Sequence, residues 1–118
     1  MSDLVPGEPL NVQALAVNSS AVEVTWDPPA DGDRNGVIRG YQIYVQPKNT
    51  NSMYYSMPLR FNTATGNVNR YNVSGLQPDT KYSVQVAALT RKGDGSRSQP
   101  VRVKTPGGVP SRPNIDLK

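Results

Sequence analysis

Apolar and polar side chains alternate with a period of two along much of this chain. The alternation is clear at residues 10–14 and 22–26, and it is most regular at residues 82–88. Because successive side chains of a strand point to opposite faces, each segment predicts a strand with one buried face. A turn signal at residues 18–20 separates the first two segments, so we expect them to form a hairpin.

Three further segments carry the same pattern, at residues 38–46, 71–76 and 101–104. Residues 91–98 are charged and rich in glycine, and we expect a loop there. No useful length of the chain shows the 3.6-residue period of a helix. Several short strands separated by turn signals predict an all-β sandwich or barrel.

Residues 47–69 are the least regular part of the chain. Residues 53–61 carry enough aromatic and aliphatic side chains for a strand, but Pro58 lies within them. Proline cannot donate to a ladder of hydrogen bonds, so this segment is expected at the edge of a sheet.

The inward positions of the alternating segments define a predicted core. Trp26 is the largest apolar side chain and is expected between two sheets. The predicted core residues are Val22, Val24, Trp26, Tyr41, Ile43, Leu76, Tyr82, Val84 and Val86.

The order of these features resembles the fibronectin type III family. Trp26 on the second strand, Tyr41 on the third and the segment 75–82 carry the resemblance, which covers residues 6–106. It implies an immunoglobulin-like antiparallel β-sandwich of about seven strands. It also implies that Tyr82 forms a tyrosine corner, in which its phenol oxygen bonds to backbone near residues 76–78.

The two ends of the chain suggest a tandem array. We expect residues 1–5 to be a linker or an expression leader, residues 6–106 to be the domain, and residues 107–118 to enter a following repeat. Residues 110–117 resemble the opening of the domain itself, and proline-bearing joints of this kind are stiff. No signal peptide is visible, so the chain is expected to be an excerpt of a larger protein.

A closer resemblance links the chain to the fibronectin repeats of LAR-type receptor protein tyrosine phosphatases. Residues 36–41, 81–88 and 90–98 carry it. It implies the extracellular part of a single-pass plasma-membrane receptor, whose repeats act as spacers and present ligand-binding surfaces in cell adhesion and axon guidance. The implied partners are neighbouring repeats and protein ligands on the cell surface or in the matrix. A repeat of a non-enzymatic neural cell-adhesion receptor is the alternative.

Composition argues against catalysis within this chain, whatever the parent protein does. The 118 residues include no cysteine and no histidine. Thiolate chemistry, disulfides and zinc–thiolate sites are therefore excluded, and the commonest general base is missing. No cofactor or metal is expected: Asp27, Asp31 and Asp33 lie closest to one another in sequence, but aspartate is common in such turns. No apolar run approaches the length of a membrane span, and the domain itself is expected to be soluble.

The net charge of +4 leaves a polyanion as a candidate partner. If the loop at 91–98 folds over the last strand, five charges gather into a site for heparan sulfate. Alternatively, these charges keep an exposed strand edge from aggregating. No aromatic platform accompanies them, so no nucleic acid partner is expected. The residues are Arg91, Lys92, Arg97, Arg102 and Lys104.

Lys92-Gly93-Asp94 resembles the tripeptide that integrins bind, with Asp94 as the metal-binding carboxylate. The alternative is an ordinary turn with family glycines. The exposed aromatic residues Tyr44, Tyr54 and Tyr55 suggest a contact surface or, equally, a cover for the flank of the sheet.

Two tripeptides, Asn18-Ser19-Ser20 and Asn72-Val73-Ser74, fit the acceptor pattern for N-linked glycans. Asn18 lies in a predicted turn, and Asn72 alternates with inward side chains. Both are expected to be exposed, and the chain is therefore a candidate glycoprotein.

Overall fold

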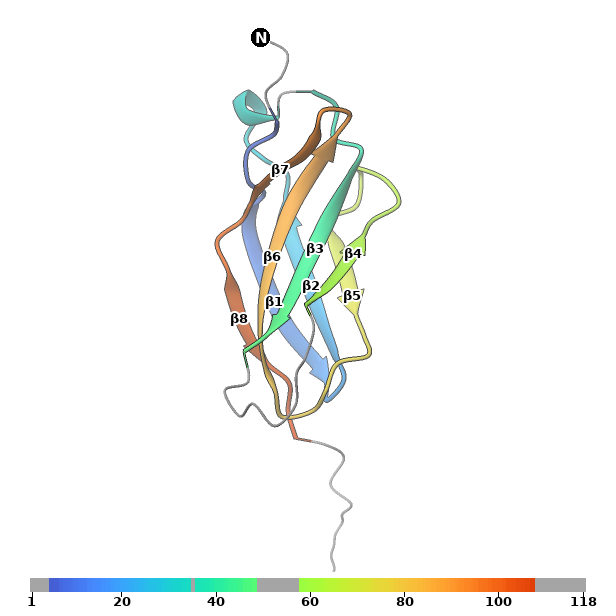
Figure 1. The fold of residues 1–118 in the computed structure, drawn as a ribbon, viewed down its shortest axis with the longest axis vertical. Coiled ribbons are helices and arrows are strands. Elements are labelled where there is room, and N and C mark those ends of the chain that lie inside the picture. Colours follow the sequence, from blue (N-terminus) through green and yellow to red (C-terminus); the bar gives the residue numbers. More distant parts are fainter. Residues whose placement is uncertain (1–4, 35, 49–57, 108–118) are drawn as a thin grey trace, which may run out of the picture.

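The computed structural model describes residues 5–34, 36–48 and 58–107, which form two antiparallel β-sheets packed face to face (Figure 1). A short 3-10 helix at Asp31–Asp33 follows the second strand. The strands are β1 (Leu10–Asn18), β2 (Ala21–Asp27), β3 (Gly40–Pro47), β4 (Leu59–Asn62), β5 (Arg70–Val73), β6 (Lys81–Thr90), β7 (Gly93–Arg97) and β8 (Val101–Lys104).

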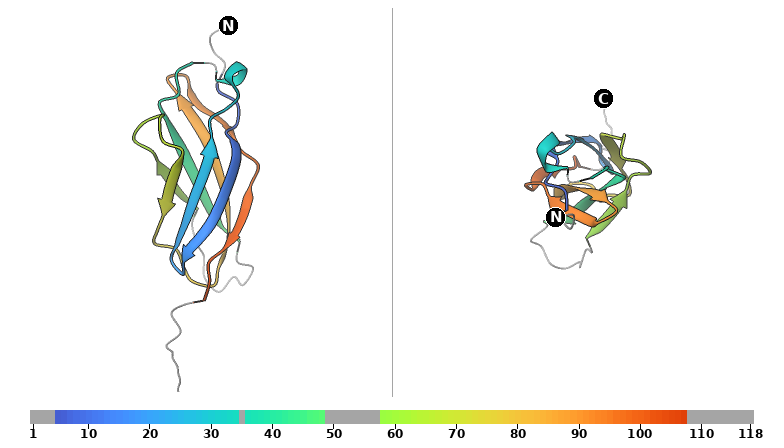
Figure 2. Two further views of the ribbon diagram at one scale, coloured as in Figure 1. Left: turned by 180° about the vertical axis from the view of Figure 1, so that it is seen from behind. Right: turned by 90° about the horizontal axis from the view of Figure 1, so that it is seen from above.

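The smaller sheet has the strand order β1-β2-β5, and the larger has the order β4-β3-β6 with both β7 and β8 paired to the far edge of β6. Figure 2 shows the two layers from behind and from above. This architecture confirms the predicted immunoglobulin-like sandwich. There are eight strands rather than seven because the last edge strand is divided into β7 and β8.

Ser98 maintains the edge where β7 and β8 are separated. Its amide donates to the carbonyl of Val86 over 2.9 Å, and its hydroxyl accepts from the amide of Val86 over 3.0 Å. The side chain of Gln85 donates to the Ser98 carbonyl at 3.0 Å. Pro100 follows, and proline cannot donate to the ladder. The serine hydroxyl therefore accepts the hydrogen bond from the Val86 amide that a carbonyl of a paired strand would otherwise accept.

The core lies between the sheets and is fully enclosed. All nine predicted core side chains are at most 5% exposed, and Val45, Val73 and Ala88 join them. The ring centroids of Trp26 and Tyr41 lie 5.2 Å apart at a tilt of 56°, an arrangement favoured by aromatic quadrupoles. Each large apolar side chain enclosed in this way contributes about 1.5–3 kcal/mol to the free energy of unfolding.

A tyrosine corner closes one end of the sandwich, as the resemblance implied. The amide of Gln77 donates to the phenol oxygen of Tyr82 over 2.8 Å. Beside it, the hydroxyl of Thr105 accepts from the amide of Thr80 at 3.0 Å and donates to the carbonyl of Gln77 at 2.7 Å. The amide of Asp79 donates to the carbonyl of Pro106. These bonds attach the end of the domain to the connection between β5 and β6.

The predicted loop at residues 91–98 was wrong. Only Arg91 and Lys92 form a turn, and β7 begins at Gly93. β7 carries almost no apolar side chain, so it shows no alternation in sequence. Its backbone is held instead by pairing with β6 and by a bond from the amide of Ser96 to the carbonyl of Pro6.

Two other predicted strands, at residues 53–61 and 71–76, have different bounds in the structure. β4 begins only after Pro58, and the predicted strand residues 53–57 lie outside the described residues. β5 ends at Val73, before Leu76. Within the described ranges, no helix has the length and apolar character needed to cross a membrane.

Candidate functional site

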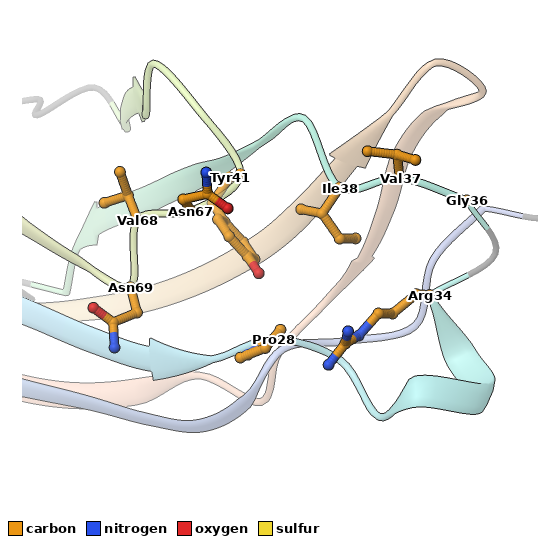
Figure 3. A pocket seen from close by; sticks show the side chains of 10 residues that line it. Pro28, Arg34, Gly36, Val37, Ile38, Tyr41, Asn67, Val68 and Asn69 are labelled. Atoms are coloured by element: carbon orange, nitrogen blue, oxygen red, sulfur yellow. The ribbon is translucent and has the colours of Figure 1, made fainter.

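One pocket lies between the connection from β2 to β3 and the connection from β4 to β5 (Figure 3). Its volume is about 580 Å³. Side chains of several kinds line it: Pro28, Arg34, Val37, Ile38, Tyr41, Asn67, Val68 and Asn69.

Tyr41 and Arg34 are the ionisable residues of this pocket. Burial raises the pKa of Tyr41 above its usual value, and the positive charge of Arg34 partly opposes that rise. Arg34 Nε donates to the carbonyl of Pro29 at 3.0 Å, and its Nη2 lies 2.9 Å from an oxygen of Asp31. Its guanidinium therefore already holds the loop together. The described residues that line this pocket include no carboxylate, histidine or cysteine.

The five basic residues singled out from the sequence do not gather at one place. β7 pairs with the end of β6 near Thr90, whereas β8 pairs with the other end near Lys81. Arg91 and Lys92 form the turn beyond Thr90, so they lie at the opposite end of β6 from Lys104. The condition for the predicted cluster, a loop folded over β8, is not met.

A different group of basic residues lies on the outer face of the larger sheet. Lys48, Lys81, Arg102 and Lys104 line a shared depression of about 560 Å³, together with Tyr82 and Val103. Lys48 and Lys81 were not among the predicted residues, because Lys48 follows β3 and Lys81 begins β6, both distant in sequence from Arg102 and Lys104. Only the pairing register, in which Lys81 stands opposite Lys104, brings them together.

Tyr44 lies on the same face, opposite Gln85 of β6, and is half-buried. The guanidinium of Arg97 lies 3.8 Å from the centre of its ring, and that of Arg60 lies 5.6 Å away. A cation over an aromatic face is held by the ring quadrupole. Tyr44 therefore fixes two arginines over the sheet. Tyr54 and Tyr55, which were grouped with Tyr44 in the sequence analysis, lie outside the described residues.

Both glycosylation candidates are exposed on the smaller sheet. Asn18 ends β1, and its side-chain oxygen accepts bonds from the amide and hydroxyl of Ser20 at 2.9 and 3.2 Å. Asn72 lies in β5, between the inward side chains of Tyr71 and Val73. Neither residue belongs to the sheet that carries the basic side chains.

The integrin-like tripeptide begins in the turn and ends within β7. Gly93 pairs with Thr90 and Asp94 pairs with Leu89, so the tip of the hairpin is formed by Arg91 and Lys92. Gly93 has a φ of +127°, which a residue with a side chain adopts at a cost. Asp94 is exposed but lies below the tip.

Asp27, at the end of β2, and Asp31, in the loop after it, each have a side-chain partner. Asp27 accepts a bond from the side-chain amide of Asn11 at 2.7 Å, and Asp31 pairs with Arg34. Within residues 5–34, 36–48 and 58–107, no group of three or more acidic, histidine or cysteine side chains could hold a metal ion.

Comparison with known proteins assigns these features to a family. The sequence model described as fibronectin type III domain matches residues 7–104. Tyrosine-protein phosphatase Lar of Drosophila melanogaster is 52% identical over 115 residues, which is 97% of this chain. Receptor-type tyrosine-protein phosphatase F of Mus musculus is 40% identical over 114 residues, or 96% of the chain. The chain spans about 6% of the length of each of these relatives.

A solved structure gives the same result. The crystal structure of the FN5 domain of Drosophila Lar superposes with a TM-score of 0.69 at 48% identity. The match covers 88% of this chain and the whole of that domain.

Proposed function

This chain belongs to the fibronectin type III family, and from that premise we propose that it is an extracellular repeat of a LAR-type receptor protein tyrosine phosphatase. The observation that carries the proposal is the identity with Drosophila Lar, which extends over nearly the whole chain. The domain itself is a structural module and is not catalytic. Any phosphatase activity resides in other parts of the parent protein.

We propose that the repeat acts as a spacer. The first described segment (blue) and the last (red) lie at opposite ends of the long axis of the sandwich (Figure 1). A domain with this geometry adds its length to an array of repeats. The proposed domain spans residues 6–106, and residues 107–118, which resemble the start of another repeat but lie almost wholly outside the described residues, would lead into the next one.

The proposed setting is the outer part of a single-pass plasma-membrane receptor that acts in cell adhesion and axon guidance. Its partners would be neighbouring repeats and protein ligands on cells or in the matrix. The rigid core and the exposed outer faces support such a role, because a spacer must hold its surfaces in fixed directions.

The test is to read the natural transcript that encodes this chain and to label intact cells that express it. We expect a transmembrane segment and a tyrosine phosphatase domain downstream, and labelling of the protein by a membrane-impermeant reagent. A transcript that encodes adhesion domains and a membrane anchor but no phosphatase would instead identify a non-enzymatic neural adhesion receptor.

We also propose that Asn18 and Asn72 carry N-linked glycans. Both side chains are exposed, and a secreted chain would pass the enzymes that modify such sites. The chain secreted from animal cells should lose the mass of two glycans on treatment with peptide N-glycosidase F. Asn18→Gln and Asn72→Gln should each remove one glycan. A secreted protein whose mass equals that of the bare chain would contradict this proposal.

A further inference from the structure

Three lysines form a row across the larger sheet. Lys81 of β6 stands directly opposite Lys104 of β8. On the other side of β6, the amide of Lys48 donates to the carbonyl of Lys81 over 2.7 Å, one residue beyond the end of β3. All three side chains are exposed. Like charges directly opposite each other in a sheet lower its stability, and among the described residues only Lys104 of the three has an acidic partner, Asp79.

Arginines extend this row along the face. Arg102 is one step further along, opposite Ser83 of β6. Arg97 pairs with Ala87 and reaches across β6 to lie on the ring of Tyr44. Ser83 and Ala87 occupy outward positions of β6, yet they are only 8% and 0% exposed. Small residues at these positions leave room for long side chains from the neighbouring strands to lie flat over the sheet.

We define the basic face as the outer face of the larger sheet, bearing six exposed side chains. Along β6, from Ala87 to Lys81, it extends over about 20 Å, because a strand rises about 3.4 Å per residue. The six side chains are Lys48, Arg60, Lys81, Arg97, Arg102 and Lys104.

Few described acidic side chains lie near the basic face. Asp79 pairs with Lys104 at 3.2 Å, and both side chains are more than half exposed, so the pair is weak. Asp94 lies at the far end, next to the turn after β6. Glu23 belongs to the opposite sheet, where it pairs with Arg70. The positive potential of the basic face is therefore largely uncompensated by the side chains described.

We propose that the basic face binds a sulfated polysaccharide lying along β6. The cations follow one another along the strand rather than surround one point, which suits a linear polymer with repeated anionic groups better than a single small anion. Guanidinium and ammonium groups both bind such anions, and the guanidiniums fixed over Tyr44 bind them with less loss of side-chain entropy. Both glycosylation candidates lie on the other sheet, so glycans there would leave this face accessible.

This inference assigns the polyanion site to different residues from those that the sequence suggested. The site now includes Lys48, Arg60 and Lys81. It no longer includes Arg91 and Lys92, which form the turn at the end of β6. It rests on the proposed extracellular setting only for its biological meaning. The purified chain can fail to bind heparin while the parent is still a receptor. It can also bind heparin when the parent is not a receptor phosphatase.

The test compares two double variants with equal loss of charge. Lys81→Ala with Arg102→Ala removes two charges from the basic face, and Arg91→Ala with Lys92→Ala removes two from the turn. Binding of the 118-residue chain to immobilised heparin is measured near physiological salt, where only charges within roughly 8 Å of one another act strongly together. We expect the face variant to weaken the Kd at least about tenfold, and the turn variant to change it less than about twofold.

Equal losses in the two variants would overturn the proposal, because binding would then follow net charge alone. Absence of heparin binding by the unaltered chain would also overturn it. Desulfated heparin, poly-glutamate and vesicles containing phosphatidylserine serve as competing probes, and tighter binding to poly-glutamate or to the vesicles would assign the face to an acidic protein or a membrane instead. Lys48→Gln with Lys81→Gln, which alters only exposed positions, repeats the test if the first face variant unfolds.

Discussion

At the scale of the residue, the hydroxyl of Thr105 connects the end of the domain to the segment between β5 and β6. Its side chain is fully buried, and it bonds to the amide of Thr80 and the carbonyl of Gln77. Its own amide donates to the carbonyl of Thr80. Nothing in the local sequence distinguished this threonine from a residue at the end of a polar strand, because both of its partners lie about 25 positions earlier.

Thr105→Val keeps the shape of the side chain and removes its hydroxyl. The buried amide of Thr80 and the part-buried carbonyl of Gln77 then lose a partner, so we expect the free energy of unfolding to fall by about 2–4 kcal/mol. Urea denaturation followed by tryptophan fluorescence measures the change. Thr105→Ser keeps the hydroxyl and should cost less than half as much. If the serine and valine variants are equally unstable, packing of the methyl group rather than hydrogen bonding explains the burial.

At the scale of the element, β7 depends on a residue far from it in sequence. Pro6 is buried, and its carbonyl accepts the amide of Ser96 over 3.1 Å. Gly95 makes this approach possible, because a Cβ there would lie 2.5 Å from that carbonyl oxygen. The lead into β1 is thus packed against the last edge of the opposite sheet.

Gly95→Ala should therefore force the N-terminal segment away from β7. We expect a loss of about 1–3 kcal/mol, the usual cost of overpacking a close contact. Differential scanning calorimetry of the variant should show a lower Tm. Gly32→Ala is the matched control, since no heavy atom lies within 4 Å of a Cβ at that position. An unchanged Tm for the Gly95 variant would mean that the lead-in is not packed as described.

These elements explain which parts of the fold were predictable. The core and most strands followed from the alternation of side chains, because one face of each strand must be buried whatever its partner. β7 escaped detection, since Gly93–Arg97 offers no apolar alternation and its position is set by β6 and Pro6. Strand pairing depends on contacts between distant segments, which the local pattern does not encode.

The basic face could not be predicted from the sequence for the same reason. Lys48, Lys81 and Lys104 are separated by more than twenty residues in sequence, and only the register of β3, β6 and β8 aligns them. The sequence pointed to Arg91 and Lys92 because they are close neighbours of Arg97. The turn of the β6–β7 hairpin places Arg91 and Lys92 beyond the end of β6, away from the basic face.

At the scale of the whole molecule, the two sheets differ in character. The larger sheet carries the basic face, and the smaller carries Asn18 and Asn72 and the ion pair between Glu23 and Arg70. The chain enters at one end of the sandwich and leaves at the other (Figure 1). The backbone bond between Asp79 and Pro106 holds the last described residues against the β5–β6 connection.

A longer fragment of the parent protein that contains this domain and the proposed following repeat should therefore be elongated. We expect its maximum dimension in small-angle X-ray scattering to be roughly double that of one domain of this size, because short proline-bearing joints act as stiff spacers. The single domain is the reference. A maximum dimension close to that of one domain would show that the two repeats fold back side by side.

The attachment of the chain end to the β5–β6 connection also determines how the domain responds to tension. A pull on residue 107 reaches the bonds of Pro106 and Thr105 first and then runs along β8, which is paired antiparallel with β6. Hydrogen bonds in such a ladder lie perpendicular to the strands, so tension along β8 loads them together in shear rather than opening them one after another. A domain pulled at its two ends would therefore meet resistance at this ladder.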